Sequence, residues 1–256
     1  MMKTPIALTM AGSDPGGGAG LQADLKVFRE LGVHGLSACA ALTAQNTTAV
    51  AGISPVPGDF FASELNVLFS DMRPDAAKTG MLFSLENIRI AARLIEENSL
   101  QNLVVDPVSI SSSGTALIEE GGLDLIKDLL FPLARVITPN IYEASLLSGM
   151  LVENVSQMEK AAAKLKEAGP GAVIITGGHL RDEAVDIFHD GKVTIRLAGK
   201  KLPGNFHGTG CVFSAALAAR LAKGDTPEQA GKKAKEFIEN RIAHAFHPGG
   251  GMGVLI

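Results

Sequence analysis

The sequence is poor in cysteine, in excess basic charge and in long apolar runs, and each shortage excludes a class of function. Only two of the 256 residues are cysteines, Cys39 and Cys211, too few for a disulfide scaffold or a thiolate metal site. A reducing cytosol is therefore the simplest location. The formal net charge of −4 argues against nucleic acid or an anionic membrane as the main partner. No apolar stretch approaches the length of a membrane-spanning helix.

Two nucleotide-binding motifs are also missing. No G-x-x-x-x-G-K-[ST] segment is present, which excludes a Walker-type phosphate loop. Residues 18–23 (GAGLQA) formally fit the dinucleotide fingerprint G-x-G-x-x-A, but residues 37–43 hold no acidic group for a ribose. Any nucleotide phosphates must therefore be held by another turn.

The chain instead alternates between short apolar runs and amphipathic segments from end to end. This alternation predicts an α/β fold, a mostly parallel sheet with helices on both faces. Asp190-Gly191 between two apolar runs predicts a hairpin that adds an antiparallel edge. No linker or repeat interrupts the pattern, so we expect a single domain over residues 1–256. Strands are expected near residues 6–11, 35–44, 76–81, 103–105, 136–137, 172–175, 185–189 and 192–197, and helices near 21–31, 60–72, 84–98, 123–130, 156–168, 212–222 and 226–246.

The segment His207–Cys211 (HGTGC) is the strongest candidate for a functional site. It leads into an alanine-rich apolar stretch that is typical of a buried helix. Its glycines leave backbone N–H groups free at the positive end of the helix dipole, which suits an anion. A thiol in the first turn is expected to have a lowered pKa. These features suggest phosphoryl transfer. A structural role, in which a flexible glycine-containing loop leads into a core helix with a buried, inert cysteine, explains the same residues equally well.

Three further positions carry polar groups where apolar ones would be expected, or where strands end. Asp24 lies within the apolar stripe of its helix, and a buried carboxylate is costly unless something pairs with it or binds it. We favour a ligand-facing role over the capping of a nearby loop. Asn140 and Glu143 are three residues apart at a helix start, so both can face the same edge.

Seven ordered segments give nearly the whole chain a resemblance to a known family. The segments are AGSD (11–14) with GGAG (17–20) and QAD (22–24), AQNT (44–47), KTGM (78–81), DPV (106–108), TPN (138–140) with Glu143, GGH (177–179) and HGTGC (207–211). Together they resemble the hydroxymethylpyrimidine and phosphomethylpyrimidine kinases of thiamine biosynthesis, within the ribokinase superfamily. The resemblance implies a ribokinase-like three-layer sandwich, ATP and Mg²⁺ as cofactors, and a homodimer.

The resemblance also implies a role for each matching residue. An amide and a carboxylate suit an aminopyrimidine, because they can bond to its ring nitrogens and exocyclic amine. Backbone N–H groups of the glycine turn would stabilise the transferring phosphoryl, and the thiol would accept the proton of the substrate hydroxyl. The implied pyrimidine-binding residues are Gly12, Asp24, Gln45, Met81 and Val108; the catalytic residues are Gly208, Thr209, Gly210 and Cys211; the nucleotide-binding residues are Asp106, Asn140, Thr176 and His207; and Glu143 and Asn140 would hold Mg²⁺, mainly through water.

The sequence departs from the family pattern at three positions. Thr176 and Ser112 stand where lysines are usual, and Phe206 replaces a small hydroxyl residue. Fewer cations near a polyphosphate put a second phosphorylation in question, because that substrate already carries a phosphate. Lys78 is a candidate to compensate.

The predicted function is the ATP-dependent phosphorylation of 4-amino-5-hydroxymethyl-2-methylpyrimidine and then of its monophosphate. One alternative is a vitamin B6 kinase, since pyridoxal and pyridoxine also carry a hydroxymethyl group. Another is a pyrimidine-binding protein with impaired catalysis, although the retained Cys211, Glu143 and glycine turn argue against it. Met81 and Val108 suit a core as well as a ligand pocket, and Gln45 suits an ordinary loop.

Overall fold

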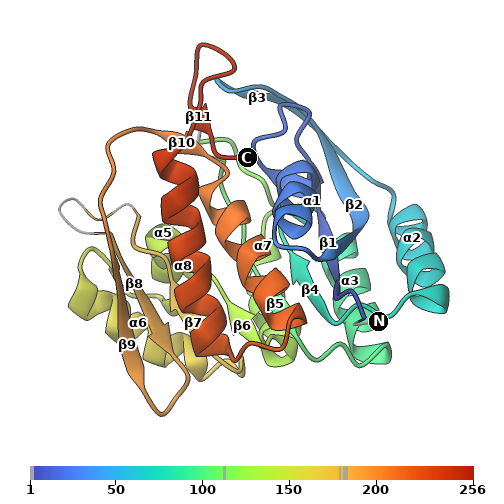
Figure 1. Ribbon diagram of the computed structural model, residues 1–256. Helices are drawn as coiled ribbons and strands as arrows, with labels where there is room; N and C mark the ends of the chain where they lie inside the picture. Colours follow the sequence, from blue (N-terminus) through green and yellow to red (C-terminus); the bar gives the residue numbers. More distant parts are fainter. Residues whose placement is uncertain (1–2, 112–113, 179, 181–183) are drawn as a thin grey trace.

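A nine-stranded sheet forms the centre of the protein (Figure 1). The computed structural model describes residues 3–111, 114–178, 180 and 184–256, so Ser112, Ser113 and His179 lie outside the described residues. The strands are β1 (Ile6–Ser13), β2 (His34–Gln45), β3 (Val50–Pro55), β4 (Ala76–Thr79), β5 (Leu103–Val105), β6 (Val136–Ile137), β7 (Val173–Ile175), β8 (Ala184–His189) and β9 (Thr194–Gly199), arranged in the order β3-β2-β1-β4-β5-β6-β7-β8-β9. The six strands from β2 to β7 in this order are parallel, while β3, β8 and β9 are antiparallel to their neighbours.

Helices cover both faces of the sheet, which confirms the predicted α/β sandwich of three layers. The helices are α1 (Gly20–Glu30), α2 (Gly58–Asp71), α3 (Leu85–Glu97), α4 (Gly122–Leu129), α5 (Ile141–Ser148), α6 (Val155–Lys166), α7 (Thr209–Ala222) and α8 (Pro227–Ala243), with a short 3-10 helix at Phe131–Leu133. Figure 1 shows α1, α7 and α8 on one face, and α2 to α6 pack on the other. Neighbouring strand residues such as Val104 and Val105 point to opposite faces, so each strand contributes to both cores.

Several local predictions differ from the structure, including the helix expected near 226–246, which ends at Ala243. The edge strand β3 was not predicted, because it is largely exposed and has no buried alternating face to produce a periodic pattern. Helix α6 begins earlier than its predicted start at Ser156, since the side chain of Asn154 accepts the backbone N–H of Gln157 and acts as the N-cap. The hairpin β8–β9 is confirmed, and α8 begins with a capping box between Thr226 and Gln229.

The carboxyl ends of the parallel strands meet at one edge of the sheet, and helix α7 begins at the same edge. Its N-cap, Gly208, has a φ of +79°, a left-handed conformation that favours glycine. A side chain here would also collide with the backbone carbonyl of Gly18. The glycine-rich segment 14–20 and the turn that starts α7 therefore touch backbone to backbone.

The end of the chain returns to this edge. Strand β11 (Gly253–Val254) pairs in parallel with β10 (Phe206–His207), directly before the turn. The preceding loop reaches the connection between β2 and β3, where the backbone N–H of Met252 donates to the carbonyl of Thr47 at 3.0 Å. Residues from the two ends of the sequence therefore build the same edge.

A charged pair lies fully buried beneath this edge. Lys78 on β4 places its Nζ 3.0 Å from both carboxylate oxygens of Asp24 on α1, and neither side chain is exposed. The hydroxyl of Thr9 donates to the same carboxylate at 2.6 Å. The burial of Asp24 therefore has a protein partner and needs no ligand, which removes the physical argument for its ligand-facing role. Lys78 is bound to Asp24 and has no exposed surface. It therefore does not replace the cations that are missing at positions 176 and 112.

Removing one member of this pair should be costly. We expect Lys78→Met to lower the free energy of unfolding by about 3–5 kcal/mol, because it leaves an uncompensated buried carboxylate. The double variant Asp24→Asn/Lys78→Met should recover most of this loss. Urea unfolding followed by circular dichroism measures both. Lys232→Met, which breaks an exposed pair with Glu228, is the control and should change stability by less than about 1 kcal/mol. A double variant no more stable than Lys78→Met would contradict this account.

Candidate active site

The sequence-predicted residues fall into two neighbouring groups at the carboxyl edge of the sheet. Gly12 lies on β1 and Gln45 ends β2, while Met81 follows β4 and Val108 follows β5. A Cβ added at Gly12 would lie 3.0 Å from the sulfur of Met81. Met81 and Val108 belong to one small apolar cluster. The second group, which follows strands β5, β6 and β7, consists of Asp106, Asn140, Glu143 and Thr176.

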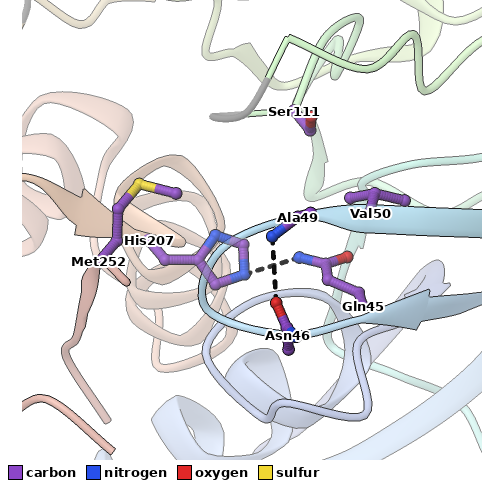
Figure 2. Close-up of a pocket in the computed structure, with 7 residues that line it drawn as sticks. All are labelled: Gln45, Asn46, Ala49, Val50, Ser111, His207 and Met252. Carbon is purple, nitrogen blue, oxygen red and sulfur yellow. Dashed lines mark hydrogen bonds between the residues drawn. The ribbon is translucent and has the colours of Figure 1, made fainter. Parts of the chain in front are cut away.

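A small pocket lies between Gln45 and His207 (Figure 2). The space among its lining residues is about 10 Å³, roughly the room of one water molecule, so a ring can enter only if its walls move. The walls include the connection between β2 and β3 and the C-terminal loop, which supplies Met252. The full lining is Gln45, Asn46, Ala49, Val50, Ser111, His207 and Met252.

His207 joins this pocket to the glycine-rich segment. Its Nε2 lies 3.0 Å from Oδ2 of Asp14 and 2.9 Å from the side-chain amide of Gln45. The sequence predicts a nucleotide contact for His207, whereas the structure places its ring with Gln45, on the side of the predicted pyrimidine residues. His207 is buried, and its Nδ1 has no hydrogen-bond partner among the described residues.

Asp14 is a site residue to which the sequence analysis assigned no role. Its carboxylate accepts backbone N–H groups from Gly16, Gly18 and Ala19 as well as the contact from His207. Burial opposes the charge, but these hydrogen bonds outweigh it and lower the pKa of Asp14. The available signal was its place between Ser13 and a run of glycines, where an acidic side chain often organises a turn.

Cys211 lies in the first turn of α7, and the backbone N–H of Gly20, at the start of α1, also faces its thiol. Although part of the residue is exposed, burial raises the pKa of the thiol to about 12. Lys78 opposes the shift, and Asp24 and Asp106 add to it. The expected lowering by the helix N-terminus is therefore wrong for this ligand-free structure. A helix dipole contributes about 0.3–1 kcal/mol, less than one pKa unit, and burial outweighs it.

Two buried carboxylates lie beside the turn. Oδ2 of Asp106 accepts the hydroxyl of Ser214 at 2.8 Å and would lie 3.8 Å from a Cβ added at Gly210. Glu143 accepts the backbone N–H groups of Ser109 and Asn140, at 3.2 and 3.0 Å. Burial and then the charge of Asp106 raise the pKa of Glu143 to about 8. Burial also raises the pKa of Asp106.

This acidic pair fits a hard cation, which would relieve the repulsion between the two carboxylates. The described part of the chain has no cluster of three or more His, Cys, Asp or Glu side chains arranged for a metal. A magnesium ion here would therefore take few protein ligands and complete its shell with water and phosphate oxygens. Asn140 caps α5 by accepting the N–H of Glu143, so its side chain serves the helix as well.

Thr176 lies next to Asn140, since the two residues form an isolated parallel bridge and the N–H of Thr176 donates to Pro139 at 3.0 Å. Its side chain brings no charge to this edge. A nearby cation is Lys201, whose Nζ donates to the backbone carbonyls of Gly178, at 3.2 Å, and Leu180.

The raised pKa of Glu143 predicts a pH dependence of stability. The folded protein holds a proton on Glu143 up to about pH 8, whereas the unfolded chain loses it near 4.5, the ordinary pKa of a glutamate. The contribution of protonated Glu143 to the free energy of unfolding is therefore complete below pH 4.5 and is lost as the pH rises through 8. Urea unfolding between pH 5 and 8, without metal or ligand, should show a shallower loss for Glu143→Gln than for the wild type. Glu236→Gln, on the surface of α8, is the control. Equal slopes for Glu143→Gln and the wild type would contradict the prediction.

Comparison with known proteins gives a consistent result over the whole chain. Residues 14–255 match the family described as phosphomethylpyrimidine kinase. The hydroxymethylpyrimidine/phosphomethylpyrimidine kinase of Bacillus subtilis (strain 168) is 41% identical over 250 residues, which cover 96% of this chain and 92% of that protein.

Two solved structures share the fold. An ADP complex of Bacillus subtilis pyridoxal kinase matches with a TM-score of 0.92 and 38% identity, over 99% of this chain and 97% of that chain. Phosphomethylpyrimidine kinase from Clostridium difficile 630 matches with a TM-score of 0.84 and 36% identity, over 93% and 100% of the two chains. Because the match spans residues 14–255, including the glycine turn, the acidic pair and the pocket, this chain belongs to the phosphomethylpyrimidine kinase family.

Proposed function

We propose that the protein transfers the γ-phosphoryl group of ATP to the hydroxymethyl group of 4-amino-5-hydroxymethyl-2-methylpyrimidine, and then to its monophosphate, for thiamine biosynthesis. The observation that carries this proposal is the meeting of three parts at one edge. These are the glycine turn Gly208–Gly210 with Cys211, the carboxylates of Asp106 and Glu143, and the pocket beside Gln45.

The glycine turn suits the moving phosphoryl group. Backbone N–H groups of Thr209 and Gly210 at the start of α7 have no earlier helical carbonyl to bond, so they are free to donate to oxygen. Asp106 and Glu143 would hold Mg²⁺ on the ATP phosphates, with Asn140 contributing through water. The ion supplies charge neutralisation on the phosphate oxygens when bound. Thr176, which lies beside Asn140, would contact the nucleotide through its hydroxyl.

A small heterocycle would enter beside Gln45 once the walls of the pocket move. Gln45 offers an amide for a ring nitrogen or amine, and Gly12, Met81 and Val108, which lie outside the lining of the closed pocket, offer apolar surface on the same edge of the sheet. Asp24, paired with Lys78, stays outside this set. The second phosphorylation is the step in which Lys201 would matter, since it brings a cation near the position that Thr176 leaves neutral. We also propose that the protein is a homodimer and that it is located in the cytosol, as predicted from the sequence.

The main competing function is a pyridoxal kinase, because a protein of that name shares 38% identity and the fold. Purified protein should be incubated with Mg-ATP and the aminopyrimidine alcohol, its monophosphate or pyridoxal, and product formation measured. We expect a higher kcat/KM for the aminopyrimidine alcohol than for pyridoxal. A higher value for pyridoxal would favour the vitamin B6 kinase. The absence of product from all three would overturn the proposal in favour of a pyrimidine-binding protein.

Cys211 is proposed as the base that accepts the proton of the substrate hydroxyl. We expect Cys211→Ala to lower kcat by about 10²–10⁴-fold while ATP still binds. Because burial raises the pKa of the thiol to about 12, the thiol is protonated at neutral pH, and the kcat/KM of the wild type should rise between pH 7 and 9. Cys211→Asp should restore part of the activity with a weaker pH dependence, since a carboxylate ionises far more readily. Wild-type kcat in Cys211→Ala would refute the role.

A further inference from the structure

The ring of His207 has one buried nitrogen without a partner. Nε2 contacts Asp14 and Gln45, whereas Nδ1 is buried and makes no hydrogen bond within the described residues. Only 10% of the side chain is exposed, and the ring lines the pocket between Gln45 and Met252 (Figure 2). A buried, unpaired polar atom is costly, so such an atom in a pocket is a candidate to bind a ligand.

The proton on the ring can be assigned from its surroundings. Asp14 is held as a carboxylate by three backbone N–H groups, so it can only accept from Nε2. In the neutral form of the ring the proton therefore sits on Nε2, and Nδ1 carries a lone pair. In that form Nδ1 is an acceptor, and its partner must be a donor.

The same assignment decides which way Gln45 faces. Figure 2 shows the amide nitrogen of Gln45 towards His207, which would oppose two N–H donors. A half turn of the amide places its oxygen towards Nε2 and its NH₂ towards Oγ1 of Thr43, at 3.2 Å. Thr43 can accept there, because its own hydroxyl proton goes to the carbonyl of Ser13. Every group of this network is then satisfied except Nδ1.

We propose that Nδ1 of His207 accepts a hydrogen bond from the exocyclic amine of the aminopyrimidine, which makes His207 a specificity-determining residue. This inference rests on the proposed function. The reacting hydroxymethyl group must reach the turn at Gly208–Cys211, and the amine is on the neighbouring ring carbon. His207 directly precedes that turn. The acceptor therefore lies where the amine of a correctly oriented ring arrives.

The same geometry distinguishes pyridoxal from the aminopyrimidine alcohol. The ring carbons on either side of its reacting hydroxymethyl group carry an aldehyde and a hydrogen. Neither donates a hydrogen bond, so Nδ1 would stay unpaired in that complex. A site with a buried acceptor rejects ligands that lack the matching donor.

The test compares two ligands that differ only in the amine: the aminopyrimidine alcohol and 2-methyl-5-hydroxymethylpyrimidine. Calorimetric titration without ATP measures their dissociation constants, and the ratio of the two is the readout. In the wild type we expect the ligand without the amine to bind at least about tenfold more weakly. A merely structural role for His207 would affect both ligands equally and leave the ratio unchanged.

Two substitutions of His207 distinguish the role of Nδ1 from that of Nε2. The side-chain nitrogen of His207→Gln can replace Nε2 and keep the bond to Asp14, but the variant lacks an acceptor at Nδ1, so the ratio should fall to about one. The side-chain oxygen of His207→Asn can replace Nδ1, so the ratio should persist while the melting temperature drops through loss of the Asp14 contact. His34→Gln, at an exposed histidine, is the control and should keep the wild-type ratio.

A wild-type ratio near one overturns this inference by itself, even if His207→Gln does not fold. A ratio that stays above tenfold in a folded His207→Gln protein overturns it as well. The kinase assay distinguishes this failure from that of the proposed function. If the aminopyrimidine is phosphorylated but the ratio is near one, only the role of His207 is lost. If wild-type protein binds neither ligand, both proposals are overturned.

Discussion

The active-site edge depends on one buried carboxylate, that of Asp14. It gathers the backbone N–H groups of Gly16, Gly18 and Ala19, and it contacts His207 from a segment nearly two hundred residues away. The glycine-rich segment is thereby curled against the start of α7, where Gly208 touches the backbone of Gly18. A carboxylate that accepts several N–H groups is strongly favoured in its charged form, so it holds the two segments of this junction together. The turn from Gly208 to Cys211 and the pocket are consequently built on a common support.

Around this junction, burial dominates the electrostatics. The thiol of Cys211 and the carboxyl group of Glu143 both have raised pKa values, because both groups are buried and the charge of Asp106 adds to the shift. The cation that pairs with Asp24, Lys78, is fully enclosed. Catalytic sites often hold groups in states that oppose folding stability, since the substrate or metal relieves them on binding. Bound Mg²⁺ and ATP would bring the missing positive charge and hydrogen-bond partners to this edge.

Substrate choice depends on a few side chains rather than on overall similarity. A pyrimidine kinase and a pyridoxal kinase resemble this chain to nearly the same degree, at 41% and 38% identity. Both kinds of substrate carry a hydroxymethyl group, which the proposed function directs to the same turn, so the turn would not select between them. The distinguishing chemistry lies on the neighbouring ring position, where an acceptor such as Nδ1 of His207 favours an amine.

The sequence by itself determined the alternation of strands and helices, the antiparallel hairpin around Asp190-Gly191, and the family, because apolar periodicity and short motifs are local properties. It also located the turn from Gly208 to Cys211. Only the tertiary structure decided the features that depend on contacts between residues far apart in the sequence. Asp24 pairs with Lys78 from another element, His207 faces Gln45 rather than the predicted nucleotide side, and Met252 closes the pocket from the far end of the chain. The protonation of Cys211 was decided in the same way, since a helix start is visible in a sequence while the depth of burial around it is not.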